Sequence, residues 1–143
     1  MASHLLNSVQ SQLLMHFKTS YEENGTVSDE MLTVLNFTFH APVLQSLDLV
    51  DHGNVTHLSS PSGRRVYQVI GSSGKPYTCL PSSGFCSCPY FTYGVLKRKE
   101  VPMCKHLLAV YISCCMNKCQ DVTISDENMT QQILACLPSD TNG

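Results

Sequence analysis

Two pairs of metal-binding side chains constrain the fold of this 143-residue sequence more than any other feature. Cys86 and Cys88 flank a single residue, and after fifteen intervening residues Cys104 and His106 flank another. Thiolate and imidazole groups together suit Zn²⁺, and structural zinc sites are usually closed tetrahedra of four such ligands. The spacing therefore predicts one structural zinc ion, bound by Cys86, Cys88, Cys104 and His106.

The residues around the two pairs indicate how each pair reaches the ion. Positions two apart on an extended strand project to one side, so the sulfurs of Cys86 and Cys88 can face a single metal. Cys104 stands where the chain enters an apolar segment with helical spacing. The free N–H groups at the start of that helix are expected to favour its thiolate and to lower its pKa.

None of the other cysteines has a partner histidine at ligand spacing. A single intracellular cysteine is most often a small buried hydrophobic residue. We expect the remaining histidines to lie at the surface, or in the core with hydrogen-bond partners for their ring nitrogens. This interpretation covers Cys79, Cys114, Cys115, Cys119 and Cys136, together with His4, His16, His40, His52 and His57.

Helical periodicity dominates residues 4–53. Apolar side chains recur every four residues, which predicts a first helix after a cap at Ser3 with one buried face. Ser28 is expected to cap a second helix and Pro42 to open a third. The residues expected on the buried face of the first helix are Leu5, Val9, Leu13, Phe17 and Tyr21, with Leu6 and Leu14 alongside.

The period changes to two between residues 54 and 88. The runs NVTHLSS, RRVYQVIG and PYTCL, separated by turn residues, predict a three-stranded antiparallel meander. A helix is expected from residue 104, and a last one from Ser125 to Leu137. We therefore predict an α+β fold: a small antiparallel three-stranded sheet with a zinc-stapled ββα module, flanked by N-terminal and C-terminal helices. The expected regions are 1–53, 54–119 (module core 77–115) and 120–143.

Composition indicates a soluble intracellular protein. Apolar residues make up 43% of the sequence and charged residues 14%, as expected of a globular chain. The N-terminal stretch MASHLLNSVQSQLL lacks the pattern of a secretory signal. The thiols are then expected to stay reduced, and the four Asn-x-Thr matches are interpreted as chance.

The enzyme classes that the motifs could indicate are disfavoured. Gly71-Ser-Ser-Gly-Lys75 lacks the spacing of a phosphate-binding loop. A catalytic zinc usually keeps one position open for water, whereas four protein ligands are present here. The His-x-Glu and Pro-Cys-x-x-Cys pattern of zinc deaminases is also absent. We therefore predict a protein that is not an enzyme.

Charge is distributed unevenly along the chain. Eight of the nine Lys and Arg residues lie at 64–118, where Glu100 is the only acid, so this stretch carries +7 between flanks of −5 and −4. Basic residues interleaved with aromatics are typical of single-stranded nucleic acid sites. The alternative is a solvated basic face whose aromatics pack round the zinc. The candidate contacts are Arg64, Arg65, Lys75, Lys97, Arg98 and Lys99, with Tyr90, Phe91 and Tyr93 nearby.

The CxC…CxH pattern resembles the SWIM zinc finger family, a ββα module. Cys104-Lys-His106-Leu-Leu-Ala109 also matches the CxHxxA signature of one subfamily, in which Ala109 would serve packing or partner contact. The whole chain further resembles the small SWIM-domain subunits of Shu complexes, strongly over residues 40–115 and weakly over the flanks. The segments that carry this resemblance are LDLVD at 47–51, SSPSGRRVYQVIGSS at 59–73, YTCL at 77–80 and CKHLLAVY at 104–111.

The resemblance implies a nuclear, non-enzymatic subunit that pairs with a RecA-like ATPase paralog. Such a complex promotes assembly of the strand-exchange recombinase on single-stranded DNA in homologous recombination repair and meiosis. Apolar side chains on the terminal helices exceed what the small sheet can cover, which favours an obligate interface. The alternative is a SWIM-containing DNA-binding or ubiquitin-pathway adaptor module.

Overall fold

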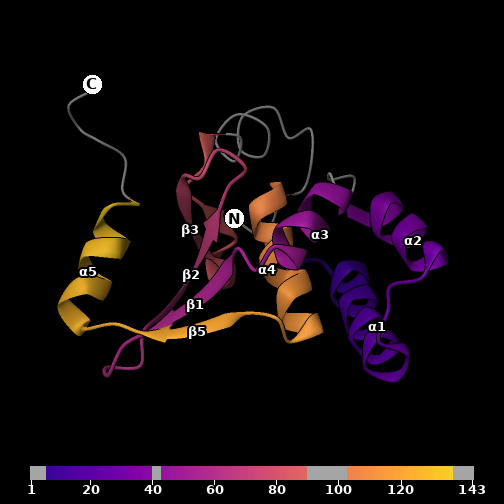
Figure 1. The fold of residues 1–143 in the computed structure, drawn as a ribbon, viewed down its shortest axis with the longest axis horizontal. Coiled ribbons are helices and arrows are strands. Elements are labelled where there is room, and N and C mark those ends of the chain that lie inside the picture. The colour runs from indigo at the N-terminus through magenta and orange to yellow at the C-terminus, as the bar shows by residue number, and fades with distance from the viewer. Residues whose placement is uncertain (1–5, 40–42, 90–102, 137–143) are drawn as a thin grey trace.

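The computed structural model describes residues 6–39, 43–89 and 103–136, which form an α+β fold as predicted. Its elements are α1 (Ser8–Asn24), α2 (Asp29–Phe39), α3 (Val43–Asp51), β1 (Val55–Ser59), β2 (Arg65–Ile70), β3 (Pro76–Leu80), β4 (Phe85–Cys86), α4 (Lys105–Met116), β5 (Gln120–Thr123) and α5 (Asp126–Leu134). In Figure 1, α4 lies between the sheet and the N-terminal helices, and α5 lies on the other side of the sheet.

The first helix begins one turn later than the sequence predicts. Asn7 caps α1 through a capping box with Gln10, and Gly25 ends the helix at φ 71°. The expected cap at Ser3 lies outside the described residues. Within α1, Leu14 and Phe17 are buried, but Val9 is 66% exposed, so its expected place on the buried face is wrong. An α-helix has 3.6 residues per turn, so residues spaced by four shift gradually round its axis. One end of such a row of side chains therefore faces solvent.

The cap expected at Ser28 is present, and Ser125, where the last helix was expected to start, also caps its helix. The hydroxyl of Ser28 accepts a hydrogen bond from Met31 N at 3.1 Å, at the start of α2. Ser125 accepts one from Asn128 N at 3.0 Å, at the start of α5. That last helix ends at Leu134, whereas Leu137 lies outside the described residues. Among the described helices, none combines the length and apolar character needed to cross a membrane.

The sheet contains the predicted meander and two further strands. β1, β2 and β3 pair antiparallel in sequence order, with Val55 opposite Val69 and Tyr67 opposite Cys79. The short β4 adds to β3, and β5 pairs parallel with the other edge of β1, which gives the order β4-β3-β2-β1-β5. The expectation of three strands is therefore wrong in number. All four residues of β5 are exposed and only Val122 is apolar, so no alternating pattern marks this strand in the sequence.

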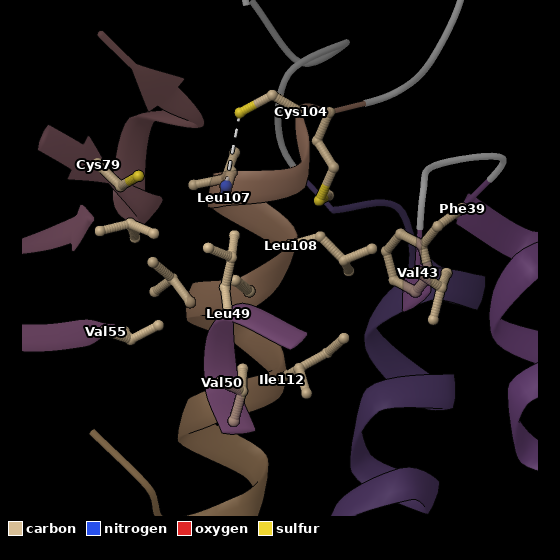
Figure 2. Close-up of a cluster of buried hydrophobic side chains, with 14 of the residues drawn as sticks. Phe39, Val43, Leu49, Val50, Val55, Cys79, Cys104, Leu107, Leu108 and Ile112 are labelled. Atoms are coloured by element: carbon tan, nitrogen blue, oxygen red, sulfur yellow. Dashed lines mark hydrogen bonds between the residues drawn. The ribbon is translucent and has the colours of Figure 1, made fainter. Parts of the chain in front are cut away.

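The sheet buries side chains on both faces. Val55 and Val69 contact the main core, whereas Leu58 and Val66 on the same strands pack with Met129 of α5. In the main core, Leu107, Leu108 and Ile112 of α4 lie between the sheet and the N-terminal helices (Figure 2). Because α4 begins at the second ligand pair, the metal site is attached directly to this core.

Candidate zinc centre

The structure brings the four predicted ligands together. One ligand atom from each of Cys86, Cys88, Cys104 and His106 lies within 4.8 Å of the others, and all four residues are buried. Zinc–ligand bonds of about 2.0–2.3 Å place tetrahedral ligands about 3.8 Å apart. A contraction of about 1 Å would thus close the cluster round one Zn²⁺, and it is the only group of this kind among the described residues.

Each ligand pair is positioned by a different element. Cys86 ends β4, opposite Cys79 on β3, and Ser87 continues the pairing because its N–H donates to Thr78 O at 3.0 Å. Cys104 is the N-cap of α4, as expected, and its sulfur accepts a hydrogen bond from Leu107 N at 3.5 Å. Figure 2 shows this bond at the top of α4. The strand end and the helix start therefore present their sulfurs to a common point.

The expected direction of the Cys104 pKa is wrong for the metal-free site. Hydrogen bonds with Cys86 and Cys88, together with burial, raise the pKa of Cys104 above its usual range. These effects outweigh the helix start because several thiols share one small, dry space. Zinc must therefore displace protons from the cluster, and the bound cation then stabilises the thiolates.

The surroundings of His106 fit a metal ligand. Its Nδ1 is buried and has no hydrogen-bond partner within the described part of the chain, which is costly unless another group binds the ring. The ring of Tyr77 packs on the imidazole, with centroids 4.6 Å apart. Gly71 leaves room for both rings, because a Cβ there would lie 3.1 Å from Tyr77 Cε2 and 3.5 Å from His106 Nε2. An unsatisfied, oriented imidazole beside three thiols is the donor set of a structural zinc site.

Cys79 belongs to the surroundings of the site, which the sequence did not indicate. It is completely buried, and its Sγ donates a hydrogen bond to Cys86 Sγ at 3.6 Å. Cys79 is thus more than the buried packing residue that we expected. No spacing signal could reveal this contact, because it arises from the register of β3 with β4.

Contacts with α3 and with the main core fix the start of α4, where Cys104 and His106 lie. Ser46 of α3 is completely buried, and its hydroxyl donates to Lys105 O at 2.8 Å. Ala109, one turn after His106, is also completely buried in the main core. A side chain with no exposed surface cannot meet a partner directly, so this burial favours packing over direct partner contact as the role of Ala109.

The basic residues predicted to contact nucleic acid do not form one described surface. Arg64 is directed to α5, where its Nη2 donates to Asp126 O at 3.0 Å and to Thr130 Oγ1 at 2.9 Å. Arg65 is exposed at the start of β2, and Lys75 is exposed in the turn before β3. The remaining candidates, Lys97, Arg98 and Lys99, and the aromatic residues Tyr90, Phe91 and Tyr93 lie outside the described residues.

The chemistry of the cluster is structural. Three thiolates and one imidazole complete a tetrahedron, and such a set leaves no vacant position at which the metal could activate water. The ion would join the end of β4 to the start of α4, across the fifteen residues that separate the two ligand pairs. We conclude that the site can bind one zinc ion and that the metal would contribute to folding.

Comparisons with known proteins agree with this geometry. A family model described as SWIM zinc finger matches residues 73–115, which include all four candidate ligands. The chain is 47% identical over 130 residues to zinc finger SWIM domain-containing protein 7 of Homo sapiens, covering 91% of this chain and 93% of the human protein. The Danio rerio protein of the same name is 49% identical over 125 residues, covering 87% of this chain and 89% of its own length.

Similarity extends to a distant organism. A Dictyostelium discoideum homolog of zinc finger SWIM domain-containing protein 7 is 32% identical over 127 residues, covering 87% of this chain and 81% of its own length. No solved structure matches the chain significantly. The similarity to these relatives covers nearly the whole chain and is not confined to the metal-binding module.

Proposed function

Because the chain belongs to the SWIM zinc finger family, we propose that it is a non-enzymatic subunit of a Shu-type complex. In this role it pairs with a RecA-like ATPase paralog in the nucleus. The pair promotes assembly of the strand-exchange recombinase on single-stranded DNA, in homologous recombination repair and meiosis. The observation that carries the proposal is the similarity to zinc finger SWIM domain-containing protein 7 over 91% of the chain, well beyond the zinc module.

The metal cluster supports a scaffolding role. The four ligands would fill every position of a tetrahedral zinc ion. The helix α4, which begins at two of these ligands, lies at the centre of the main core. Zinc therefore stabilises the arrangement of the sheet and α4, on which α1 and α3 pack. A subunit of this kind presents a surface and leaves the ATPase chemistry to its partner.

Exposed apolar side chains support a protein interface on the N-terminal helices. Seven large apolar residues are exposed in the described part of the chain, and five of them lie on α1, α2 and α3: Val9, Met15, Val34, Phe37 and Leu44. Val34 and Phe37 are 43% and 77% exposed and lie three residues apart, hence on one side of α2. Aromatic and aliphatic side chains exposed on one face are typical of residues that a partner covers.

The electrostatics favour DNA contact through a complex. Arg64, one of the six candidate contacts, is engaged with the first turns of α5. The stretches on either side of the basic centre carry −5 and −4, which opposes binding of a polyanion by this chain alone. The ATPase partner would then supply much of the single-stranded DNA affinity.

The test is affinity purification of the tagged chain from nuclease-treated cell extract, followed by mass spectrometry. Nuclease treatment removes proteins that are recovered only through DNA. We expect a RecA-like ATPase paralog as the dominant partner, recovered in a defined ratio. Dominant recovery of ubiquitin-ligase subunits, or recovery of no ATPase, would instead favour the adaptor alternatives and contradict the proposal.

A paired variant tests the α2 surface within the same experiment. Val34→Asp combined with Phe37→Asp places two charges on the exposed apolar side of α2 and should reduce recovery of the ATPase at least tenfold. Asn36→Asp adds a charge to the same helix at an exposed polar position and is the matched control. Parental recovery with the double variant would show that the partner binds another surface.

A further inference from the structure

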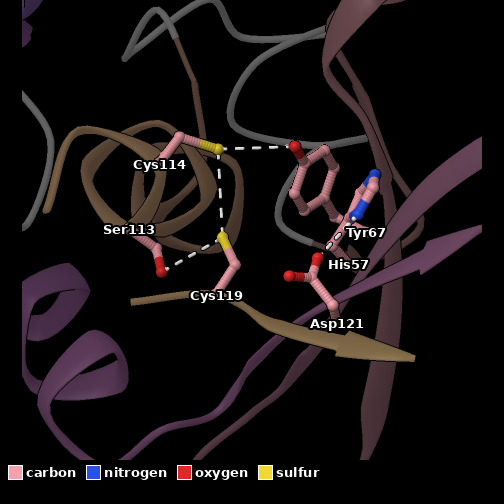
Figure 3. A network of polar contacts seen from close by, with 6 residues as sticks. All are labelled: His57, Tyr67, Ser113, Cys114, Cys119 and Asp121. Carbon is pink, nitrogen blue, oxygen red and sulfur yellow. Dashed lines mark hydrogen bonds and ion pairs between the residues drawn. The ribbon is translucent and has the colours of Figure 1, made fainter. Parts of the chain in front are cut away.

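A second sulfur cluster lies away from the zinc centre, at the junction between α4 and β5. The Sγ atoms of Cys114 and Cys119 are 3.9 Å apart, and neither residue belongs to the metal-binding group. Figure 3 shows both sulfurs directed toward each other, with Tyr67 and Ser113 on either side. A disulfide needs a sulfur separation of about 2.05 Å, so a movement of about 2 Å would join them.

The turn after α4 creates this proximity. Asn117 ends the helix in the left-handed conformation, with φ 55°, and is the only non-glycine residue with positive φ among those described. Lys118 N then donates to Ser113 O at 2.9 Å, which reverses the chain and returns Cys119 to the side of Cys114. The pair is thus held by backbone hydrogen bonds and not by chance side-chain rotation.

The surroundings favour a thiolate at Cys114. The hydrogen bond with Cys119 is the largest cause of its lowered pKa of about 6, burial opposes it, and the Tyr67 hydroxyl and the nearby His57 lower it further. Tyr67 Oη lies 3.4 Å from Cys114 Sγ, and its ring packs on His57, whose Nδ1 lies 3.0 Å from Asp121. The same hydrogen bond, with burial, raises the pKa of Cys119 above its usual range, so the pair shares one proton.

The thiolate is accessible to small molecules. Cys114 is exposed and Cys119 is half-buried. A pocket of about 420 Å³ opens between α1 and the end of α4, and Cys114 lines it together with Lys18, Tyr21 and Asn117. The zinc ligands, in contrast, are all buried. An exposed thiolate with an adjacent thiol is the arrangement of redox-sensitive cysteines.

We propose that Cys114 and Cys119 form a redox-sensitive dithiol, which a hydroperoxide converts to an intramolecular disulfide while the zinc site stays intact. The Cys114 thiolate attacks the terminal oxygen, the O–O bond breaks, and Cys114 becomes a sulfenic acid while the peroxide leaves as alkoxide or hydroxide and takes up a proton. Cys119 sulfur then attacks Cys114 sulfur, which forms the S–S bond and releases water. The two thiols lose two electrons in total and the peroxide gains them.

The disulfide would act on the edge of the sheet. Cys119 directly precedes β5, whose pairing with β1 is supported by the contact between His57 and Asp121. Joining Cys119 to the last turn of α4 removes the hydrogen bond between Cys114 and Tyr67 and restricts the start of β5. The oxidised chain should therefore differ from the reduced one at this junction and not at the metal.

The experiment treats zinc-loaded protein with hydrogen peroxide and maps disulfides by mass spectrometry after tryptic digestion under non-reducing, alkylating conditions. Trypsin cleaves after Lys105 and Lys118, which places Cys114 and Cys119 on different peptides, so their disulfide appears as a cross-linked pair. Cys115 shares the first peptide and Cys136 the second, and Cys115→Ser and Cys136→Ser show whether either contributes. A chromophoric chelator measures released zinc in parallel.

Three results are expected. The cross-link forms in the parent chain and in Cys115→Ser, and it is lost in Cys114→Ser. In Cys119→Ser, sulfenic acid accumulates at Cys114 and is trapped by dimedone. Zinc remains bound at the time when the cross-link is complete.

A pH profile adds a readout that mere accessibility would not give. Alkylation of Cys114 should reach half its maximal rate at a pH of about 6, whereas burial raises the pKa of Cys136, which should react only at higher pH. Equal oxidation of Cys114 and Cys136, a cross-link through Cys115, or zinc release before the cross-link would each overturn the proposal.

Discussion

Gly71→Ala tests how closely Gly71 and Tyr77 pack round His106, one of the four candidate zinc ligands. The added Cβ would lie 3.1 Å from Tyr77 Cε2, a distance at which the ring must move by a few tenths of an ångström. Tyr77 packs on the His106 ring with centroids 4.6 Å apart, so its displacement is passed to the imidazole. Gly71 does not have positive φ, and the substitution therefore acts through space and not through backbone strain.

The magnitude follows from the packing. Overpacking a well-filled site costs about 1–3 kcal/mol, and the half-buried Tyr77 can yield, so we expect about 1 kcal/mol. Removing a group that orients a metal ligand lowers metal affinity by about tenfold or more, and a displacement that costs about 1 kcal/mol has a smaller effect. Gly71→Ala should therefore weaken zinc binding by about five- to tenfold and lower the melting temperature of the zinc-loaded protein by several degrees.

Competition with a chromophoric chelator measures the zinc affinity, and calorimetry measures the melting temperature. Ser73→Ala, at an exposed position in the same turn, is the matched control and should behave as the parent. Replacing Tyr77 by Leu in the Gly71→Ala background should recover part of the loss, because the contact at 3.1 Å is removed. Parental zinc affinity and melting in Gly71→Ala would refute the proposed fit.

Three further predictions concern the metal, the helix and the basic centre. Cys88→Ser should destabilise the fold by several kcal/mol, since structural zinc contributes on the order of 10 kcal/mol to folding. A melting curve identical to that of the parent would contradict this prediction. Parent protein that contains no zinc after purification without chelator would contradict it as well. Ala109→Val should cost about 1–3 kcal/mol by overpacking a completely buried position, and normal melting together with parental partner recovery would disprove it. Alanine at all three positions 97–99 should weaken single-stranded DNA binding by the partner-bound complex and flatten the slope of log K against log salt by about 0.7 per lost contact. An unchanged slope would assign the basic centre to a solvated face, and Arg65→Ala should be measured in parallel.

The sequence alone determined the features that depend on local spacing. The four ligands stand in two short pairs, and each pair needs only a strand end or a helix start to present its donors. The meander β1–β3, the helix cap at Ser28 and the start of the last helix at Ser125 were likewise predicted, because alternation and helix starts involve residues within a few positions of one another. The α+β class followed from the order of these local patterns.

Only the tertiary structure decided which distant residues meet. β5 has one apolar residue and no alternation, and it pairs with β1 because α4 returns the chain to that edge of the sheet. Cys79 lies beside the metal ligands through strand register, and Cys114 meets Cys119 through a left-handed turn at Asn117. Such contacts depend on the directions in which whole elements pack, and a linear pattern carries little information about those directions. The zinc ligands could be predicted from the sequence, whereas the roles of Cys79, beside the site, and of Cys114 and Cys119, away from it, depend on the fold.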